Sequence, residues 1–186
     1  MTTRSPAPKL TYDDLLRLPE DRLRHELIDG EHFMSPSPTL QHQRIVLNLG
    51  RILSTFVLAR RLGEVFVAPL DVLFSNVDVV EPDVLYVASE GADRLQERFI
   101  AGAPDLVVEV LSKSTRGLDK IKKRRLYERG GVREYWIVDP TTETVEIYRA
   151  AGGSFTRQAP LSLAAGDTLE TPLLAGLQIP LHEVFR

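Results

Sequence analysis

The sequence predicts an α/β domain in which a mixed central sheet is flanked by helices. Residues 40–62 carry apolar side chains at helical spacing, and a second helix is expected over residues 118–129. Short apolar runs rich in β-branched residues lie between and after these segments, at 65–74, 79–87, 106–111 and 133–138. Apolar runs of this length that alternate with helices are typical of a sheet whose faces are covered by helices.

The composition is that of an ordinary folded domain. The chain has 186 residues, 43% hydrophobic and 26% charged, which is enough for one domain with a substantial core. We expect residues 10–186 to form a single domain and residues 1–9, which are polar and contain two prolines, to be disordered. No apolar run approaches the roughly 18 residues of a membrane-spanning helix, and nothing near Met1 resembles a signal peptide. The absence of cysteine excludes disulfides and thiolate metal sites, and a cytoplasmic location is expected.

The chain is expected to begin with a short helix and a hairpin. Thr11 is suited to cap a helix over residues 12–18, which Pro19 would end. Residues 25–34 read as two short strands, because Asp29-Gly30 suits the type I′ turn that joins hairpin strands.

The helix over residues 40–62 is predicted from its caps as well as from its apolar stripe. Thr39 can cap its first turn, and Gly63 can end it in the left-handed conformation. His42 opens the stripe. A lone histidine there is more often a hydrogen-bonded core residue, but beside a catalytic centre it would bind a phosphate or hold a water.

The second half of the chain continues the alternation. We expect a helical piece around residues 93–99, and the helix over 118–129 should end at Gly130-Gly131. The strand over 133–138 should pair with an antiparallel partner at 144–149. The remaining tail has several Gly and Pro breaks and is expected to add one or two edge strands.

Two acidic residues lie in strands that should be buried. Glu109 interrupts the apolar run over 106–111, where an unpaired carboxylate would cost several kcal/mol, and Asp83 stands at the start of another apolar strand. Carboxylate oxygens are the ligands that Mg²⁺ prefers. Because a lysine-rich helix follows, the pattern favours a divalent metal site that faces a phosphate.

Positive charge is concentrated in one segment. The chain carries a formal net charge of −3, but residues 113–134 hold nine Lys and Arg against three acids. The side chains expected to contact nucleic acid are Lys113, Lys120, Lys122 and Arg124. Such a run can mark a phosphate-binding face, and it can equally be a solvated helix surface.

The order of elements and motifs resembles one known family. The matching residues are the hairpin 25–31, Ser35-Pro-Ser-Pro38 with His42, Glu81-Pro-Asp83, residues 104–112, Asp119 with Lys123 and Tyr127, and residues 131–140. Together they are similar to the Uma-two family of restriction endonucleases, within the PD-(D/E)xK nuclease superfamily. The resemblance spans nearly all of residues 12–185 and implies a restriction-endonuclease-like fold.

The resemblance implies that Asp83 and Glu109 ligate Mg²⁺ (or Mn²⁺), with the backbone carbonyl of Val110 as a further ligand. The superfamily signature places a lysine two residues after the second acid, where this chain has Leu111. The candidates to replace it are Lys113, Lys120, Lys122 and Lys123. Lys123 is favoured because it matches the family's lysine on the following helix, and it would act as the catalytic lysine with Asp83 and Glu109. The alternative is that Lys123 forms a surface pair with Asp119.

Further residues have two readings each. Glu26 and Glu31 either complete the acidic cluster or are solvated strand residues, and Ser112 and Ser114 more often cap a turn than touch substrate. Three aromatic side chains are expected to pack in the core and at contacts between elements, and the alternative is that they stack on bases. They are Tyr127, Tyr135 and Trp136.

Two functional hypotheses follow. The first is a metal-dependent endonuclease that hydrolyses DNA phosphodiester bonds. The second is a catalytically inactive nuclease fold that acts as a nucleic-acid-binding or assembly module. A homodimer is left open. No Gly-rich phosphate loop or Ser nucleophile elbow is present, which excludes the main competing enzyme classes.

Overall fold

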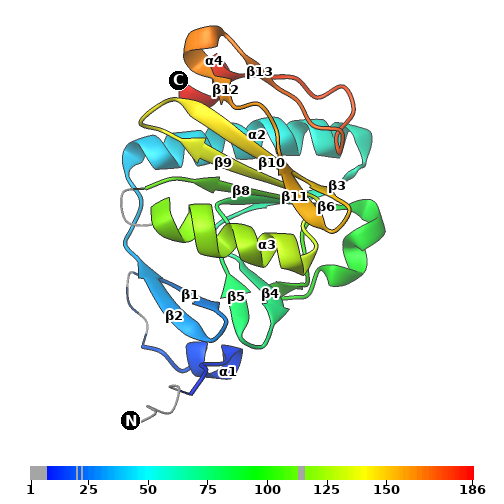
Figure 1. Cartoon of the computed structure of the whole chain (residues 1–186). Coiled ribbons are helices and arrows are strands. Elements are labelled where there is room, and N and C mark those ends of the chain that lie inside the picture. Colours follow the sequence, from blue (N-terminus) through cyan, green and yellow to red (C-terminus); the bar gives the residue numbers. More distant parts are fainter. Residues whose placement is uncertain (1–7, 20, 22, 113–115) are drawn as a thin grey trace.

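Helices cover both faces of a central mixed sheet in the computed structural model, which describes residues 8–19, 21, 23–112 and 116–186 (Figure 1). The disorder predicted for residues 1–9 therefore falls largely outside the described residues. The central sheet has seven strands, in the order β11-β10-β9-β8-β6-β3, with β12 also paired to β10. Their bounds are β3 Gly63–Val67, β6 Val84–Ala88, β8 Leu106–Val110, β9 Glu134–Asp139, β10 Thr144–Ala151, β11 Ser154–Arg157 and β12 Leu161–Ser162. Strands β8 and β9 are parallel and their neighbours antiparallel, so the sheet is mixed as predicted.

Alternation along the buried strands produces two cores. Val108 and Trp136 point to the face that helix α2 (Leu40–Arg60) covers, whereas Val107 and Tyr135 point to the face that helix α3 (Arg124–Gly130) covers. This is why β8 and β9 are buried at every position and read in the sequence as continuous apolar runs.

A second, five-stranded sheet lies below the first in Figure 1, in the order β2-β1-β5-β4-β7. Its strands are β1 Arg24–Ile28, β2 Glu31–Ser35, β4 Asp71–Ser75, β5 Asp78–Val80 and β7 Phe99–Ala101. The predicted hairpin is confirmed, because Asp29 and Gly30 have φ values of 54° and 74°.

The two strands predicted over residues 65–74 and 79–87 are each divided between the sheets. The first breaks into β3 and β4 around Pro69, and the second into β5 and β6 around Pro82. Proline cannot donate to a strand ladder, so each run leaves one sheet and enters the other at its proline. The second break places Asp83 directly before β6.

Both predicted helix N-caps are present, but the first helix ends at Leu15, three residues before its predicted end. Thr11 forms a capping box at α1 (Tyr12–Leu15), and Thr39 caps α2. The prediction that Gly63 ends α2 was wrong, because Arg61 adopts the left-handed conformation there and Gly63 already belongs to β3. The helical piece predicted at 93–99 was misplaced, because the helix there is the 3₁₀ helix η1 (Ser89–Arg94) and Phe99 already belongs to β7.

The lysine-rich helix has two parts. Its first turns form a π-helix, η2 (Leu118–Lys123), which continues into α3 and ends at Gly131 with φ of 90°. Short π-helical segments within helices are frequently found at functional sites.

The tail supplies the predicted edge strand β11 and a cap over α2. It contains η3 (Leu163–Ala165), the two-stranded pair β13 (Thr168–Leu169) and β14 (Ile179–Pro180), and α4 (Leu181–Phe185). The side-chain amide of Asn48 donates to the carbonyl of Val184 at 3.1 Å, which ties α4 to α2. Among the described helices, none combines the length and apolar character needed to cross a membrane.

Candidate active site

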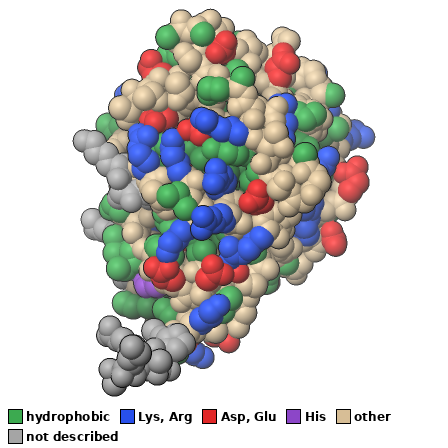
Figure 2. All heavy atoms as spheres, viewed as in Figure 1, with side chains coloured by type: hydrophobic (Ala, Val, Ile, Leu, Met, Phe, Trp, Pro, Cys, Tyr) green, Lys and Arg blue, Asp and Glu red, His purple; other side chains and the backbone are tan. Residues whose placement is uncertain are grey.

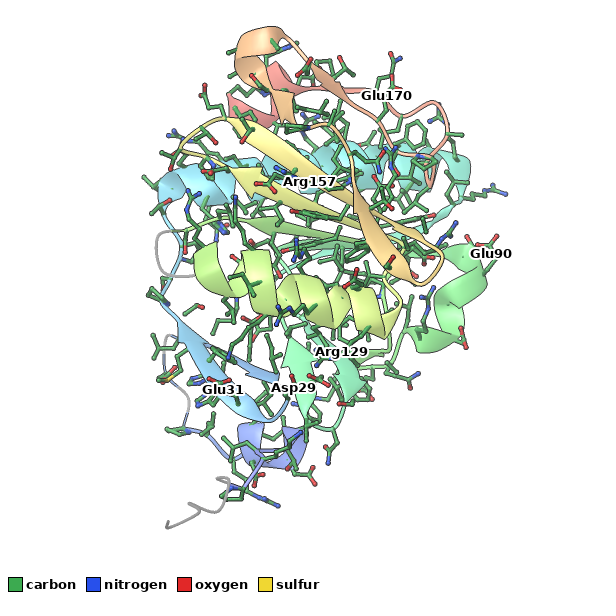
Figure 3. All side chains as sticks on the ribbon, in the orientation of Figure 1. Asp29, Glu31, Glu90, Arg129, Arg157 and Glu170 are labelled. Carbon is green, nitrogen blue, oxygen red and sulfur yellow. The ribbon has the colours of Figure 1, made fainter. Side chains whose placement is uncertain are left out.

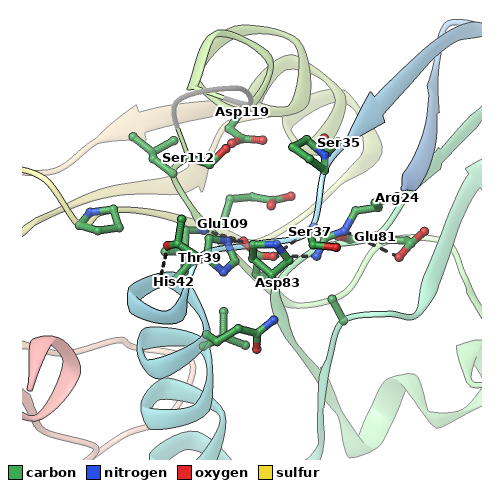
Figure 4. Close-up of a pocket in the computed structure, with 18 of the residues that line it drawn as sticks. Arg24, Ser35, Ser37, Thr39, His42, Glu81, Asp83, Glu109, Ser112 and Asp119 are labelled. Atoms are coloured by element: carbon green, nitrogen blue, oxygen red, sulfur yellow. Dashed lines mark hydrogen bonds and ion pairs between the residues drawn. The ribbon is translucent and has the colours of Figure 1, made fainter. Parts of the chain in front are cut away.

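A pocket of about 760 Å³ opens where β1, β6 and β8 meet the first turn of α2 and the start of η2 (Figure 4). Its neutral wall is formed by the Ser35–Thr39 segment and by Pro140 and Thr141. The charged and titratable side chains that line it are Arg24, Glu26, His42, Glu81, Asp83, Glu109, Asp119 and Lys123.

Strand pairing brings the two predicted acids together. Strands β6 and β8 are antiparallel and pair Val84 with Val108, so the next position on each strand sets Asp83 beside Glu109. Both side chains are only 2% exposed, and both line the pocket. The charge of Asp83 is one of the causes that raise the pKa of Glu109. Asp83 and Glu109 therefore line one pocket, and their sharing of one ion stays a prediction.

Asp83 accepts four hydrogen bonds. Both terminal nitrogens of Arg24 donate to Oδ1, at 3.0 and 3.1 Å. The backbone N–H of Val110 donates to Oδ2 at 2.8 Å, and Nε2 of His42 lies 3.1 Å from the same oxygen. Burial by itself raises the pKa of Asp83, but the hydrogen bond from His42 and the charge of Arg24 outweigh it and hold that pKa below its usual value. Asp83 is therefore an ionised carboxylate.

Lys123 lies at the centre of a buried ion network. Its Nζ is 2.7 Å from Oε1 of Glu26, 2.9 Å from Oε1 of Glu109 and 3.6 Å from Oδ1 of Asp119. The hydroxyl of Tyr127 donates to Oε1 of Glu109 at 2.6 Å. Burial alone would lower the pKa of Lys123, but the surrounding carboxylates raise it, so the ammonium stays charged. Burial raises the pKa of Glu109 well above its usual value despite the neighbouring lysine.

The inward face of the η2–α3 helix supplies this network. Asp119, Lys123 and Tyr127 follow one another at four-residue spacing, and each is at most 1% exposed. The reading of Asp119 and Lys123 as a surface pair was therefore wrong. Leu111, at the position of the signature lysine, is 4% exposed, belongs to the same hydrophobic cluster as Leu126 and borders the pocket.

His42 and the two hairpin acids differ in burial and in whether they line the pocket. His42 is buried, as a core residue would be, yet it lines the pocket, and its Nδ1 has no hydrogen-bond partner among the described residues. Glu26 is 1% exposed and also accepts from the backbone N–H of Glu81 at 2.9 Å, so the solvated reading of Glu26 was wrong. Glu31 is exposed and pairs with Lys122 outside the pocket.

The aromatic residues belong to the core. Tyr127, Tyr135 and Trp136 are fully buried and expose no ring for base stacking. Ser112 lines the pocket, and Ser114 lies outside the described residues.

The basic segment is largely neutralised by acids from other elements. Lys120 pairs with Glu146 of β10 at 2.6 Å, and Lys122 pairs with Glu31. Figure 2 shows acidic side chains interspersed among the basic ones over this face, and Figure 3 shows Arg129 of α3 next to Asp29 of the hairpin turn, 3.0 Å away. The local excess of positive charge is therefore smaller in space than along the sequence.

The two remaining predicted nucleic-acid contacts are Arg124 and Lys113. The guanidinium of Arg124 lies over the ring of Tyr148, 5.4 Å from its centroid. Lys113 lies outside the described residues. Contact of these side chains with nucleic acid stays a prediction.

Sequence reasoning missed two residues of the pocket. Arg24 precedes Glu26 in β1, and no pattern singles it out in the sequence. Glu81 is part of the Glu81-Pro-Asp83 motif, and burial raises its pKa to about 7. Its position two residues before Asp83 was the only available signal.

The donors fit a hard divalent cation. Carboxylate oxygens suit Mg²⁺ or Mn²⁺ better than softer metals. Within the part of the chain that the structure describes, no three Asp, Glu, His or Cys side chains are grouped as ligands of one ion. Mg²⁺ in proteins is commonly held by one or two carboxylates with waters and a substrate phosphate. Asp83 and Glu109 place two such carboxylates in the lining of one pocket.

Comparison with known structures agrees with the fold. A crystal structure of "a putative nuclease belonging to DUF820" from Anabaena variabilis ATCC 29413 superposes with a TM-score of 0.75 at 23% identity. The match covers 95% of this chain and 97% of that one. At this identity the likeness shows the fold, and it confirms the predicted α/β architecture of mixed sheets flanked by helices.

Two relatives from Synechocystis sp. (strain ATCC 27184 / PCC 6803 / Kazusa) share most of the chain. The uncharacterized protein sll1609 is 29% identical over 149 residues, which are 79% of this chain and 82% of that protein. The uncharacterized protein slr1290 is 30% identical over 149 residues, which are 77% of this chain and 76% of that protein.

The family profile matches almost the whole domain. It spans residues 12–182 and carries the description "Putative restriction endonuclease". The match includes both sheets and every side chain of the pocket, and it agrees with the motifs found in the sequence. The chain belongs to the Uma2 family.

Proposed function

We propose that the protein is a metal-dependent endonuclease that hydrolyses DNA phosphodiester bonds in the pocket around Asp83, Glu109 and Lys123. The observation that carries this proposal is the buried contact of 2.9 Å between the Nζ of Lys123 and Glu109, beside Asp83. A buried lysine held among carboxylates costs desolvation energy, which a purely structural core could avoid with apolar side chains. The family description and the nuclease with the same fold support the same reaction class.

In this proposal each side chain has one task. Lys123 supplies a fixed positive charge for the oxygens of the phosphate as negative charge develops in the transition state. Tyr127, whose hydroxyl donates to Glu109 at 2.6 Å, keeps that carboxylate turned toward the pocket. His42 orients Asp83 through its contact at Oδ2.

Asp83 and Glu109 would hold Mg²⁺ or Mn²⁺. When bound, such an ion polarises a phosphoryl oxygen and lowers the pKa of a coordinated water. Glu26, within 2.7 Å of Lys123, keeps the lysine charged and in place.

The test is single-turnover cleavage of plasmid and oligonucleotide DNA with Mg²⁺ or Mn²⁺. Asp83→Asn should abolish cleavage, and Lys123→Met should lower its rate by about 10²–10³, the usual effect of losing one pre-organised donor. Lys120→Ala is the matched control. It removes a lysine of the same helix that pairs with Glu146 outside the pocket, and it should cost much less. If a Lys123→Met preparation that is free of contaminating nuclease cleaves DNA at the wild-type rate, Lys123 has no catalytic role.

The inactive nuclease fold is the second candidate, and a specific observation favours it. Leu111 is packed in the core, and the acceptor sites of Asp83 are occupied by protein donors. This candidate predicts that wild type and Asp83→Asn are equally inactive on every DNA substrate. It also predicts that both bind DNA with the same affinity.

A further inference from the structure

Arg24, which no sequence pattern singled out, hydrogen-bonds to Asp83, the predicted metal ligand. A carboxylate offers about four acceptor positions. Arg24 fills two of them at Oδ1 of Asp83, and the backbone of Val110 and Nε2 of His42 fill the two at Oδ2. A cation can therefore bind Asp83 only if one of these donors withdraws.

The three donors differ in their freedom to move. The N–H of Val110 belongs to the backbone of β8 in the centre of the sheet. His42 is fixed in the first turn of α2, and its side chain is 9% exposed. The side chain of Arg24 is 22% exposed, and it reaches Asp83 from the hairpin strand β1. Arg24 is thus the donor that can leave at the lowest cost.

Arg24 also has a second partner within reach. Its Nε lies 3.8 Å from Oε2 of Glu81, and its Nη1 donates to the backbone carbonyl of Glu81 at 3.0 Å. Figure 4 shows Arg24 between Asp83 and Glu81. A small rotation of the guanidinium exchanges one carboxylate for the other, so the positive charge need not lose its pairing when Asp83 is released.

We propose that Arg24 is a displaceable cation, which holds Asp83 in the metal-free protein and moves toward Glu81 when a divalent ion binds. Its guanidinium then remains in the pocket and contacts the substrate phosphate, for which its planar fork is well matched. The first half concerns ion binding alone. The second half, the phosphate contact, rests on the proposed nuclease function.

The proposal predicts opposite effects of one substitution on two measurements. Arg24→Gln removes the competitor for Asp83, so Mn²⁺ should bind about tenfold more tightly, as expected for the loss of one charge-assisted interaction. The same variant should cleave DNA more slowly at saturating Mn²⁺. A residue that merely positions Asp83 would instead weaken both ion binding and cleavage when removed.

Mn²⁺ binding is measured without DNA, by calorimetry and by the electron paramagnetic resonance signal of the free ion. Lys120→Gln removes a positive charge outside the pocket and should leave the Mn²⁺ affinity unchanged. Arg24→Lys keeps the charge but cannot place two donors on Oδ1, so its affinity should lie between those of wild type and Arg24→Gln. This variant also serves if Arg24→Gln fails to fold.

A double-mutant cycle with Glu81→Gln tests the second partner. If Glu81 acts by receiving Arg24, Glu81→Gln weakens Mn²⁺ binding in the wild type and has little effect beside Arg24→Gln. An equal loss in both backgrounds would mean that Glu81 binds the ion itself, and the exchange would be wrong.

Failure of this proposal is distinguishable from failure of the proposed function. Unchanged or weaker Mn²⁺ binding by both Arg24 variants, or no binding by any variant, would overturn the displaceable cation. Tighter binding by Arg24→Gln in a protein that cleaves no DNA would uphold it and refute the nuclease.

Discussion

Removal of Lys123 tests the buried ion network through the stability of the fold. In Lys123→Met the side-chain volume is nearly kept, but Glu26, Glu109 and Asp119 lose the ammonium that lies 2.7, 2.9 and 3.6 Å from them. Lys123 is 1% exposed, so the methionine takes over a site that is shielded from solvent. Breaking a buried ion pair by removing one partner costs about 3–5 kcal/mol of unfolding free energy.

The loss should depend on pH in a defined direction. Burial raises the pKa of Glu109 in the folded protein above its pKa in the unfolded chain. Between these two pKa values the folded state binds a proton that the unfolded state does not, so the free energy of unfolding falls as pH rises through this range. Removing the lysine raises the pKa of Glu109 further. The destabilisation should therefore be largest above neutral pH and smaller near pH 5, where a carboxyl of the cluster can take a proton.

The assay is urea unfolding at pH 5 and pH 8, with thermal melts as a second measure. A loss of about 3–5 kcal/mol corresponds to a melting temperature lower by roughly 6–20 °C in a domain of this size. Lys122→Met is the matched control, because Lys122 is exposed and its pair with Glu31 should contribute about 0–1 kcal/mol. If Lys123→Met unfolds within about 1 kcal/mol of wild type at pH 8, the network does not hold a buried charge and the reasoning is wrong.

Three further predictions use other residues. Burial raises the pKa of Glu81 from 4.5 to about 7, so the free energy of unfolding should fall as pH rises between these values, by up to about 1.4 kcal/mol per pH unit. Glu81→Gln should flatten the curve of stability against pH in that window. An unchanged curve would contradict the burial of Glu81. Leu111→Lys restores the signature lysine at a core position that is 4% exposed, and urea unfolding should show a loss of several kcal/mol with no gain in cleavage. Thr39→Ala removes the hydroxyl that caps α2, which should cost about 1 kcal/mol by urea unfolding, whereas Thr39→Ser should be near neutral.

Local sequence signals identified most elements and three of the site residues. The apolar run around Glu109, the proline before Asp83 and the four-residue spacing of Asp119, Lys123 and Tyr127 each reflect a constraint between neighbours in the chain. Strand burial, turn geometry and helix faces depend on such short-range patterns, so they could be read directly. The replacement of the signature lysine by Leu111 could also be read directly from the sequence.

The charges and their partners were decided by tertiary structure. Nothing near Arg24 indicates that it reaches Asp83, because the two residues are brought together by a hairpin and a strand that belong to different sheets. Likewise, no residue near Glu26 in the sequence indicates that it pairs with Lys123, which lies on a helix far along the chain.

The sequence by itself determined that one acid would stand in a buried strand, that a second would stand at the entry of another, and that a lysine would follow on one helix face. Only the tertiary structure decided that Lys120 and Lys122 are neutralised by Glu146 and Glu31, and that the predicted metal ligand is already held by an arginine. The physical reason is that electrostatic energy depends on distance in space and on burial, and a linear sequence specifies neither for residues far apart along the chain.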